Sequence, residues 1–202
     1  MNIHPLILEK LNSNEELKID IGCGISKKIG FIGIDKLPLD GVDIVFDFEN
    51  GLNFIPDNSV DIIYSSHLVE HIENLELFFS EIHRILKKDG KKIMIVPHFS
   101  NPYYYSDYTH KRFFGLYSMN YFSNDNNGYK RGVPSFYNNI KFKTHNITLK
   151  FRCHPFYFRN KFRALFTKII NSSKFMQEWY ESSLTGYIPC QELIFEFSPI
   201  KD

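Results

Sequence analysis

The chain has 202 residues, of which 43% are apolar, and this length and composition fit one domain with a buried core. Its formal net charge is only +1, so no overall field of one sign selects nucleic acid or another highly charged partner. The three cysteines, Cys23, Cys153 and Cys190, are widely spaced, which excludes a disulfide framework and a zinc-binding cysteine motif.

The N-terminal residues have no basic region followed by an apolar run, so we expect no signal peptide. No window of the sequence approaches the roughly 20 apolar residues that are needed to span a bilayer. A cytoplasmic location is therefore the expectation.

A short helix is expected at residues 5–11, and five strands are expected after it. The strands are placed at residues 17–21, 31–35, 42–46, 60–65 and 92–97. Most of them are dense in Ile and Val, as is typical of a parallel sheet that helices cover on both faces. The order of these elements predicts an α/β fold.

The clearest helix is expected at residues 74–88, between the fourth and fifth strands. Its apolar residues recur at the spacing that places them on one helix face: Leu75, Phe78, Ile82, Ile85 and Leu86. Asn74 can cap the start of this helix, and Asp89-Gly90 is expected to end it.

The second half of the chain has a different character. Residues 99–140 are rich in Tyr, Phe, Asn and Ser, and we expect them to form an aromatic-rich cap over the sheet. Antiparallel strands are expected at residues 143–151 and 193–200, with a helix at 156–170 between them. The predicted fold is a Rossmann-like, mostly parallel sheet with C-terminal antiparallel strands.

We expect residues 1–202 to form a single domain. Within it, residues 15–98 form the core that binds a cofactor, residues 99–190 supply substrate-facing insertions and a late strand, and residues 191–202 form the closing strand. The connections after the first two strands are unusually short for this kind of fold.

One of these short connections is a glycine turn with the sequence Asp20-Ile-Gly-Cys-Gly24, and the next strand ends at Asp35. A glycine turn after one strand and a carboxylate at the end of the next are how an α/β protein binds the ribose of an adenosine-containing cofactor. No full helix fits between Gly22 and Gly30, so a pyrophosphate would lack the helix N-terminus that it needs. This counts against NAD and is compatible with S-adenosylmethionine, which has no phosphate.

The chain resembles the class I S-adenosylmethionine-dependent methyltransferases, and in particular a small group related to methyltransferase type 11. The matching segments are Asp20–Gly24, Gly33–Asp35, Asp47-Phe48, Asp57–Asp61, His67–His71, Arg84–Gly90, Pro97-His98 and Asp107–Phe114. The group is often linked to glycan modification. The resemblance therefore implies methyl transfer to oxygen or nitrogen of a small molecule, with a sugar or glycan precursor as the acceptor.

The resemblance also implies which residues bind the cofactor. Asp20 would organise the glycine turn, Asp35 would accept hydrogen bonds from both ribose hydroxyls, and Asp47 would accept from the adenine amino group. The full set implied is Asp20, Gly22, Cys23, Gly24, Asp35, Asp47, Phe48, Ser66 and His67.

The catalytic candidates are His98, Asp107 and His110, which follow the fifth strand. A sugar hydroxyl needs a general base, so we expect His98 or His110 to be that base, oriented or charged by Asp107. In the alternative, Asp107 caps a turn and His110 donates to a main-chain carbonyl. These three side chains could also hold a metal, but their spacing is not diagnostic, and no metal site is assigned.

Two other functions stay open. Residues 150–168 interleave basic and aromatic side chains, which could contact RNA in an RNA methyltransferase. The same segment could lie on an anionic bilayer, in a membrane-binding or partner-binding module without catalysis. The near-neutral charge argues against nucleic acid, and the three acids Asp20, Asp35 and Asp47 argue against a module that binds no cofactor. Peripheral membrane contact and the oligomeric state stay open.

Overall fold

The structure is a computed structural model that describes residues 3–13, 15–151 and 160–201. Its strands are β1 (Lys18–Ile21), β2 (Ile32–Asp35), β3 (Ile44–Val45), β4 (Val60–Ser66), β5 (Leu86–Pro97), β6 (Phe142–Lys150) and β7 (Glu192–Pro199). Its α-helices are α1 (Pro5–Asn12), α2 (Leu75–Ile85), α3 (Asn160–Ile170) and α4 (Lys174–Ser183).

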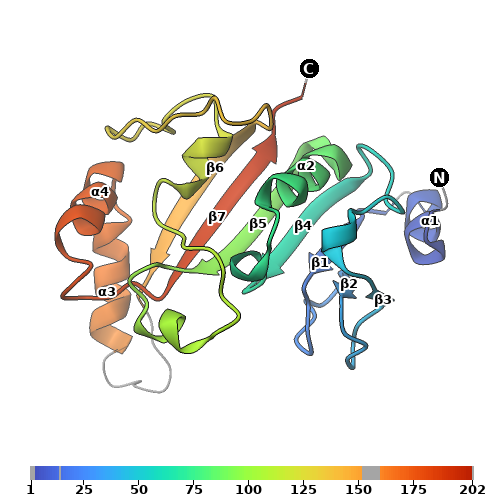
Figure 1. Cartoon of the computed structure of the whole chain (residues 1–202), viewed down its shortest axis with the longest axis horizontal. Coiled ribbons are helices and arrows are strands. Elements are labelled where there is room, and N and C mark those ends of the chain that lie inside the picture. Colours follow the sequence, from blue (N-terminus) through green and yellow to red (C-terminus); the bar gives the residue numbers. More distant parts are fainter. Residues whose placement is uncertain (1–2, 14, 152–159, 202) are drawn as a thin grey trace.

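The seven strands form one sheet in the order β3-β2-β1-β4-β5-β7-β6. Strands β1 to β5 pair in parallel, whereas β7 is antiparallel to both β5 and β6. In Figure 1 the sheet crosses the whole molecule, with α1 beside its β1–β3 end and α3 and α4 beside its β6 end. The predicted α/β fold class, including the antiparallel strands near the C-terminus, is confirmed.

The parallel strands all end at one edge of the sheet, which we call the carboxyl edge. The glycine turn follows β1, Asp35 ends β2, and the segment from His67 to His71 follows β4 at this edge. Residues 22–31, between β1 and β2, form turns and contain no helix. The predicted short connection is therefore confirmed, and it leaves the carboxyl edge open beside β1 and β2.

Helix α2 packs its apolar face against the sheet. Phe78, Phe79, Ile82 and Ile85 are all buried, and Asn74 caps the helix by accepting from the backbone N–H of Leu77 at 3.0 Å. The ring of Phe79 contacts the rings of Phe142 and Phe197, with centroids 6.0 and 6.2 Å away. One helix thus joins the parallel strands to the late antiparallel ones.

The predicted C-terminal end of this helix is wrong. Helix α2 ends at Ile85, and Leu86 already has extended backbone and pairs with Val60 of β4. Asp89-Gly90 lies inside β5, where a Cβ on Gly90 would stand 2.9 Å from the carbonyl oxygen of Val60. Glycine is needed there because the neighbouring backbone comes so close, and not because a helix stops.

The late helical region is longer than predicted. Residues 160–170 of the expected helix form α3, whereas residues 152–159 lie outside the described part of the chain. A further helix, α4, was not predicted. Ser173 caps it by accepting from the backbone N–H of Met176 at 3.2 Å, which is a local signal that the sequence carries.

Lys92 lies in the middle of β5 and has no exposed surface. Its ammonium donates to Ser65 Oγ and lies 3.4 Å from the Ile93 carbonyl. Burial lowers the pKa of Lys92 well below its usual value. In the unfolded chain Lys92 keeps its proton up to about pH 10.4. Between the lowered pKa of the folded state and this value, the unfolded state binds more protons than the folded state. The stability of the fold therefore rises with pH over that range.

We expect the double variant Lys92→Met with Ser65→Ala to be more stable than the parent by about 1–3 kcal/mol at pH 7, because it removes a buried amine together with the hydroxyl that it contacts. The gain should shrink at pH 9, where the parent itself becomes more stable. Urea denaturation at both pH values measures this. A destabilised double variant at pH 7 would show that the ammonium is better accommodated than its burial indicates.

Candidate functional site

The glycine turn after β1 uses backbone conformations that favour glycine. Gly22 and Gly24 have φ angles of +69° and +51°. The Gly22 N–H donates to the Ile34 carbonyl at 2.8 Å, which ties the turn to β2. A Cβ on Gly22 would lie 2.8 Å from Leu68 Cδ1, whereas a Cβ on Gly24 would meet nothing within 4 Å. The turn is therefore packed on the side of β4 and open at Gly24.

Asp35 stands beside this opening. One carboxylate oxygen accepts from the backbone N–H of Gly24 at 2.9 Å, and the other accepts from Leu37 N–H at 3.0 Å. Each carboxylate oxygen can accept a further hydrogen bond. Asp35 is thus held in place by its own chain and keeps acceptor capacity for two neighbouring hydroxyls.

Asp20 has an internal role. It is 2% exposed, and its Oδ2 accepts from the backbone N–H of Lys28 at 2.8 Å. Burial raises the pKa of Asp20, and this hydrogen bond opposes the shift. Asp20 therefore holds the chain that returns from the glycine turn to β2.

Cys23 packs inside the turn. It is 6% exposed, and a Cβ on Gly33 would lie 2.8 Å from its sulfur. Burial, followed by the charges of Asp20 and Asp35, raises the pKa of the Cys23 thiol to about 11. The thiol is therefore protonated at neutral pH, and Cys23 contributes packing and backbone rather than a nucleophile.

Asp47 and Phe48 follow β3 and differ in exposure. The Asp47 side chain is exposed and caps a short 3-10 helix by accepting from Glu49 N–H at 3.1 Å. Phe48 is 7% exposed and belongs to the hydrophobic core. Asp47 thus remains accessible at the carboxyl edge, whereas little of the Phe48 ring is free to contact a ligand.

His67 follows Ser66 at the end of β4 and has an unusual backbone, with φ +53°. Its Nδ1 lies 3.2 Å from Glu70 Oε1, and its Nε2 lies 3.4 Å from Glu192 Oε1. These carboxylates, Glu192 first, raise the pKa of His67 to about 9, and the pKa of Glu192 falls to about 2. His67 is therefore charged at pH 7 and cannot act as a base there.

The structure brings together three side chains that we call the Glu70–His71–His110 cluster. One ligating atom of each lies within 4.8 Å of the other two, and the two imidazole centroids are 4.8 Å apart. Glu70 has no exposed surface. The sequence motifs contained both histidines, but nothing in their spacing indicated that the loop after β5 returns to the segment after β4.

Of the three catalytic candidates, His98 is separate from the other two. It is fully buried; its Nδ1 accepts from Ser100 N–H at 3.0 Å, and its Nε2 lies 2.8 Å from Glu181 Oε2. Both ring nitrogens are therefore engaged inside the protein, and the imidazole has no surface on which to meet an acceptor.

Asp107 and His110 do lie together. Asp107 Oδ1 accepts from Thr109 N–H at 2.9 Å and from Thr109 Oγ1 at 2.6 Å, while its Oδ2 lies 3.6 Å from His110 Nε2. His110 Nδ1 lies 2.9 Å from the Tyr104 carbonyl. These contacts match the alternative in which Asp107 caps a turn and His110 bonds to a main-chain carbonyl. In this arrangement His110 Nε2 lies beside the exposed Asp107.

Glu181 of α4 was missed from the sequence. Its Oε2 pairs with His98, and its Oε1 accepts from Leu116 N–H at 2.8 Å. Both ends of the loop between His98 and Leu116 are thus tied to one carboxylate. Helix α4 therefore positions the loop that carries Asp107 and His110.

We expect Glu181→Gln to lower the free energy of unfolding by about 1–2 kcal/mol, because an amide can accept from only one of the two donors. Glu76→Gln is the control, since Glu76 is exposed on α2. Urea denaturation monitored by circular dichroism measures both. Equal stability of the two variants would contradict the anchoring role of Glu181.

Aromatic side chains surround the cluster on the loop side. Tyr104 lies with its ring centroid 4.5 Å from His110 and 4.8 Å from Phe113. The exposed members of this set are Tyr103, Tyr105, Tyr108 and Phe113. The described residues therefore place an exposed aromatic surface next to the two imidazoles.

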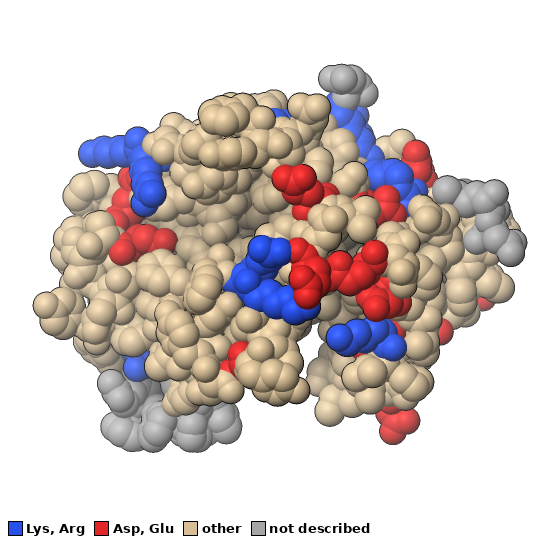
Figure 2. All heavy atoms as spheres, viewed as in Figure 1, with Lys and Arg blue, Asp and Glu red and all other residues tan. Residues whose placement is uncertain are grey.

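Charges on the surface are mixed. On the face shown in Figure 2, acidic and basic side chains lie next to one another near the middle, and much of the rest is uncharged. Among the described residues, this face offers no continuous basic track for phosphates. Among the described helices, none is both long and apolar enough to cross a membrane.

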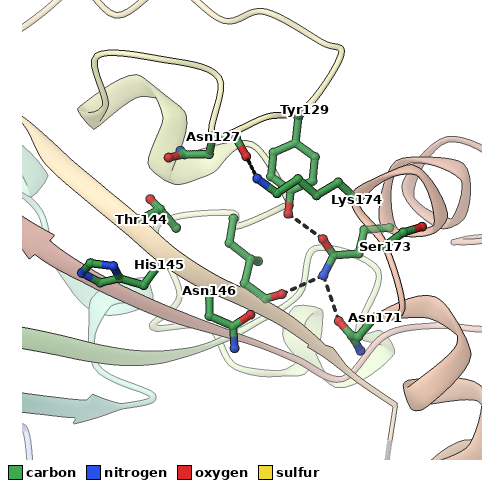
Figure 3. A pocket seen from close by; sticks show the side chains of 10 residues that line it. Asn127, Tyr129, Thr144, His145, Asn146, Asn171, Ser173 and Lys174 are labelled. Carbon is green, nitrogen blue, oxygen red and sulfur yellow. Dashed lines mark hydrogen bonds between the residues drawn. The ribbon is translucent and has the colours of Figure 1, made fainter.

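A polar pocket of about 210 Å³ lies between β6 and α4 (Figure 3). Gln177 crosses it, accepting from Tyr129 Oη at 2.6 Å and donating to the Ile147 carbonyl at 2.7 Å. Thr144 also lines the pocket. In the sheet it is level with Phe197 of β7, and Phe197 is level with Lys92 near the middle of β5. The pocket is thus distinct from the carboxyl edge, and its polar groups largely bond to one another.

A family model described as a methyltransferase domain matches residues 34–94, from the end of β2 into β5. The match covers less than a third of the chain and starts after the glycine turn. No curated protein matches the chain in sequence.

Solved structures are similar over nearly the whole chain. A SAM-dependent methyltransferase from Thermotoga maritima is 16% identical with a TM-score of 0.52, over 96% of this chain and 87% of its own. A SAM-dependent methyltransferase from Archaeoglobus fulgidus is 16% identical with a TM-score of 0.50, over 96% and 92%. The YcgJ protein from Bacillus subtilis is 14% identical with a TM-score of 0.50, over 97% and 98%.

The strand order and these neighbours define the fold as that of the class I methyltransferases. The methyltransferase-domain match over residues 34–94 agrees with this fold, and together they support the S-adenosylmethionine-dependent methyltransferase that the motifs predicted. The glycine turn fits this cofactor, because Gly24 faces open space with the Asp35 carboxylate beside it.

Proposed function

We propose that this methyltransferase acts on an oxygen or nitrogen of a small molecule, and that its acceptor is a sugar or glycan precursor. The observation that carries the proposal is the Glu70–His71–His110 cluster. It lies at the carboxyl edge, joined to the glycine turn through Leu68, and exposed aromatic rings flank it.

On the cofactor side, we assign the ribose hydroxyls to Asp35 and the adenine amino group to Asp47. Gly22 and Gly24 present backbone to the methionine part, and the side chain of Asp20 keeps the turn in shape. Ser66 and His67 belong to the same surface, at the end of β4. The accessible oxygens of Asp35 and Asp47 support these assignments.

On the acceptor side, the exposed rings of Tyr105, Tyr108 and Phe113 provide flat apolar faces. Such faces pack against the C–H faces of sugars, while hydroxyls at the ring edges reach polar groups. The neighbouring imidazoles and Asp107 supply those polar groups. A sugar therefore suits this surface better than a purely apolar acceptor.

When bound, S-adenosylmethionine supplies the methyl carbon, to which the acceptor oxygen bonds while the C–S bond breaks and its electron pair stays on sulfur. A hydroxyl has to lose its proton in this reaction, whereas a neutral amine does not. Charged His67 cannot take that proton, and both nitrogens of His98 are engaged. We therefore place activation of the acceptor at the Glu70–His71–His110 cluster.

The test is incubation with methyl-labelled S-adenosylmethionine and separate pools of nucleotide sugars, free sugars, amines and RNA. We expect the label on a sugar hydroxyl. Phe113→Ala should raise the KM for that sugar about tenfold, through loss of aromatic contact, with cofactor binding unchanged. Phe175→Ala is the matched control, because Phe175 is 59% exposed and Phe113 is 63% exposed. Label found only on amines or RNA would contradict the proposal.

A membrane-bound acceptor is a second candidate, because α3 exposes Phe162, Leu165 and Ile169 on one face. These positions are spaced as the apolar side of an interfacial helix. Flotation with liposomes that contain anionic lipid tests it: Phe162→Asp should release the bound protein. Absence of the parent protein from the lipid fraction would rule this candidate out.

A further inference from the structure

We infer that Glu70, His71 and His110 form a binding site for a divalent transition-metal cation, with Zn²⁺ as the best match. Within the described residues, this is the group of histidine, cysteine and acidic side chains whose ligating atoms approach closely enough, at 4.8 Å or less. Two independent observations, the hydrogen bonding of the imidazoles and the buried oxygen of Glu70, point to a cation.

The hydrogen bonds of the two imidazoles favour the tautomer that a metal needs, with the hydrogen on Nδ1. His110 Nδ1 lies 2.9 Å from the Tyr104 carbonyl, which can only accept, so Nδ1 carries the hydrogen. His71 Nδ1 lies 3.3 Å from the Thr109 carbonyl and 2.9 Å from Thr109 Oγ1. Since Thr109 Oγ1 donates its one hydrogen to Asp107, it must accept from His71. In the neutral form of each ring the lone pair is therefore on Nε2, and that of His110 lies 3.6 Å from Asp107 Oδ2.

This pattern is the one that metal-binding histidines show. Their second ring nitrogen usually donates to a carbonyl or carboxylate, which fixes the ring and raises its basicity as a ligand. Here Tyr104 accepts from His110 and Thr109 accepts from His71, and both acceptors lie on one loop. The same loop is tied to the third ligand, because the Glu70 carbonyl accepts from Lys111 N–H at 2.8 Å and Arg112 N–H at 3.1 Å.

Glu70 supplies a buried oxygen that nothing else uses. Its side chain is fully buried, Oε1 contacts His67, and Oε2 has no hydrogen-bond partner among the described residues. A buried carboxylate oxygen without a partner is unfavourable, and a cation would satisfy it. The His67 imidazole lies on the side of Oε1, so it does not occupy Oε2.

The donor set selects the kind of cation. Two imidazoles and one carboxylate suit Zn²⁺ or Fe²⁺, whereas Mg²⁺ and Ca²⁺ prefer oxygen ligands alone. Two nitrogens on one Zn²⁺ lie at most about 4.2 Å apart, twice the bond length, so a pair of ligating atoms 4.8 Å apart would have to approach by at least about 0.6 Å. Three protein ligands leave a fourth position open.

The open position is where we place the acceptor hydroxyl; this role rests on the proposed function, whereas cation binding does not. The cation would make a hydroxyl in this position lose its proton to solvent more easily, so that the oxygen could take the methyl group as described above. The cation would thus perform the activation that we assign to the cluster.

The experiment is calorimetric titration of the EDTA-stripped protein with Zn²⁺, with Mg²⁺ as the second probe. We expect one Zn²⁺ per chain, no heat with Mg²⁺, and at least tenfold weaker binding for Glu70→Gln and for His110→Gln. His145→Gln, which removes an exposed imidazole of β6, should bind as the parent does. Absorption of the Co²⁺ complex should be lost in the same two variants.

Circular dichroism of each metal-free variant verifies that it is folded. The inference is overturned if Zn²⁺ does not bind, or if His145→Gln weakens binding as much as the cluster variants do. Binding of S-adenosylhomocysteine to the stripped protein is measured in parallel. Zn²⁺ bound without methyl transfer to a sugar contradicts the proposed function alone, whereas sugar methylation that persists without Zn²⁺ binding overturns the metal site alone.

Discussion

Asp35→Ala is expected to weaken the binding of S-adenosylmethionine and S-adenosylhomocysteine at least about 100-fold. Two hydroxyl donors would lose a charged acceptor, and hydrogen bonds to charged groups contribute about 1.5–3 kcal/mol each, or about a factor of 10 per 1.4 kcal/mol. Isothermal titration with S-adenosylhomocysteine measures the loss.

Asp40→Ala is the control, because it removes an exposed carboxylate four residues before β3 begins and leaves Asp35 intact. Asp35→Asn separates the loss of ligand binding from the loss of local structure. Its amide oxygen still accepts one backbone hydrogen bond, from Gly24 or Leu37. We expect it to fold as the parent and to bind more weakly. If Asp35→Ala and Asp40→Ala bind the ligand equally well, Asp35 does not hold the ribose.

Gly22→Ala is expected to destabilise the protein by about 2–5 kcal/mol, which combines a left-handed backbone with forced contact. The new methyl would stand 2.8 Å from Leu68 Cδ1 and 2.9 Å from Leu68 Cβ. For a chain of this size the midpoint of thermal unfolding should fall by about 5–15 °C. Differential scanning calorimetry measures it.

Gly24→Ala is the matched variant, because it has the same kind of backbone and nothing within 4 Å of the new Cβ. It should lose only about 1–2 kcal/mol of stability, from the backbone alone. Its larger effect should be on cofactor affinity, since the methyl would occupy the open side of the turn. A Gly24→Ala protein as unstable as Gly22→Ala would show that Leu68 does not restrict the turn.

Much of the fold was readable because the strands of a parallel sheet carry an unambiguous pattern. Dense Ile and Val, a glycine turn and carboxylates at strand ends identified β1 to β4 and placed Asp20 and Asp35 at one edge. The absence of a helix between Gly22 and Gly30 could also be predicted, because too few residues were available. All of these features are determined by residues that are close together in the sequence.

The errors arose where distant segments decide the structure. Helix α2 stops at Ile85 because Leu86 pairs with Val60, a contact that the apolar spacing of the helix does not reveal. The catalytic role of His98 stays a prediction, but its contact with Glu181, 83 residues later, could not be predicted from the motif. Local motifs named both histidines of the cluster, yet only the return of the loop after β5 brings His110 to His71.

The role of each predicted cofactor residue stays a prediction until a ligand is seen. Asp35, Gly22 and Gly24 have the conformations that the role requires, whereas Phe48 is mostly enclosed by the core. The motif Asp47-Phe48 could not indicate that the Phe48 ring is buried. Residues 152–159, part of the basic and aromatic segment, lie outside the described chain.

The most direct test is a crystal structure of the protein grown with S-adenosylhomocysteine. We predict electron density for the ligand along the carboxyl edge, with its ribose hydroxyls on Asp35, its amino acid part over Gly22–Gly24 and its sulfur facing the Glu70–His71–His110 cluster. Density elsewhere on the molecule, or none in a protein that is saturated with the ligand, would contradict the account.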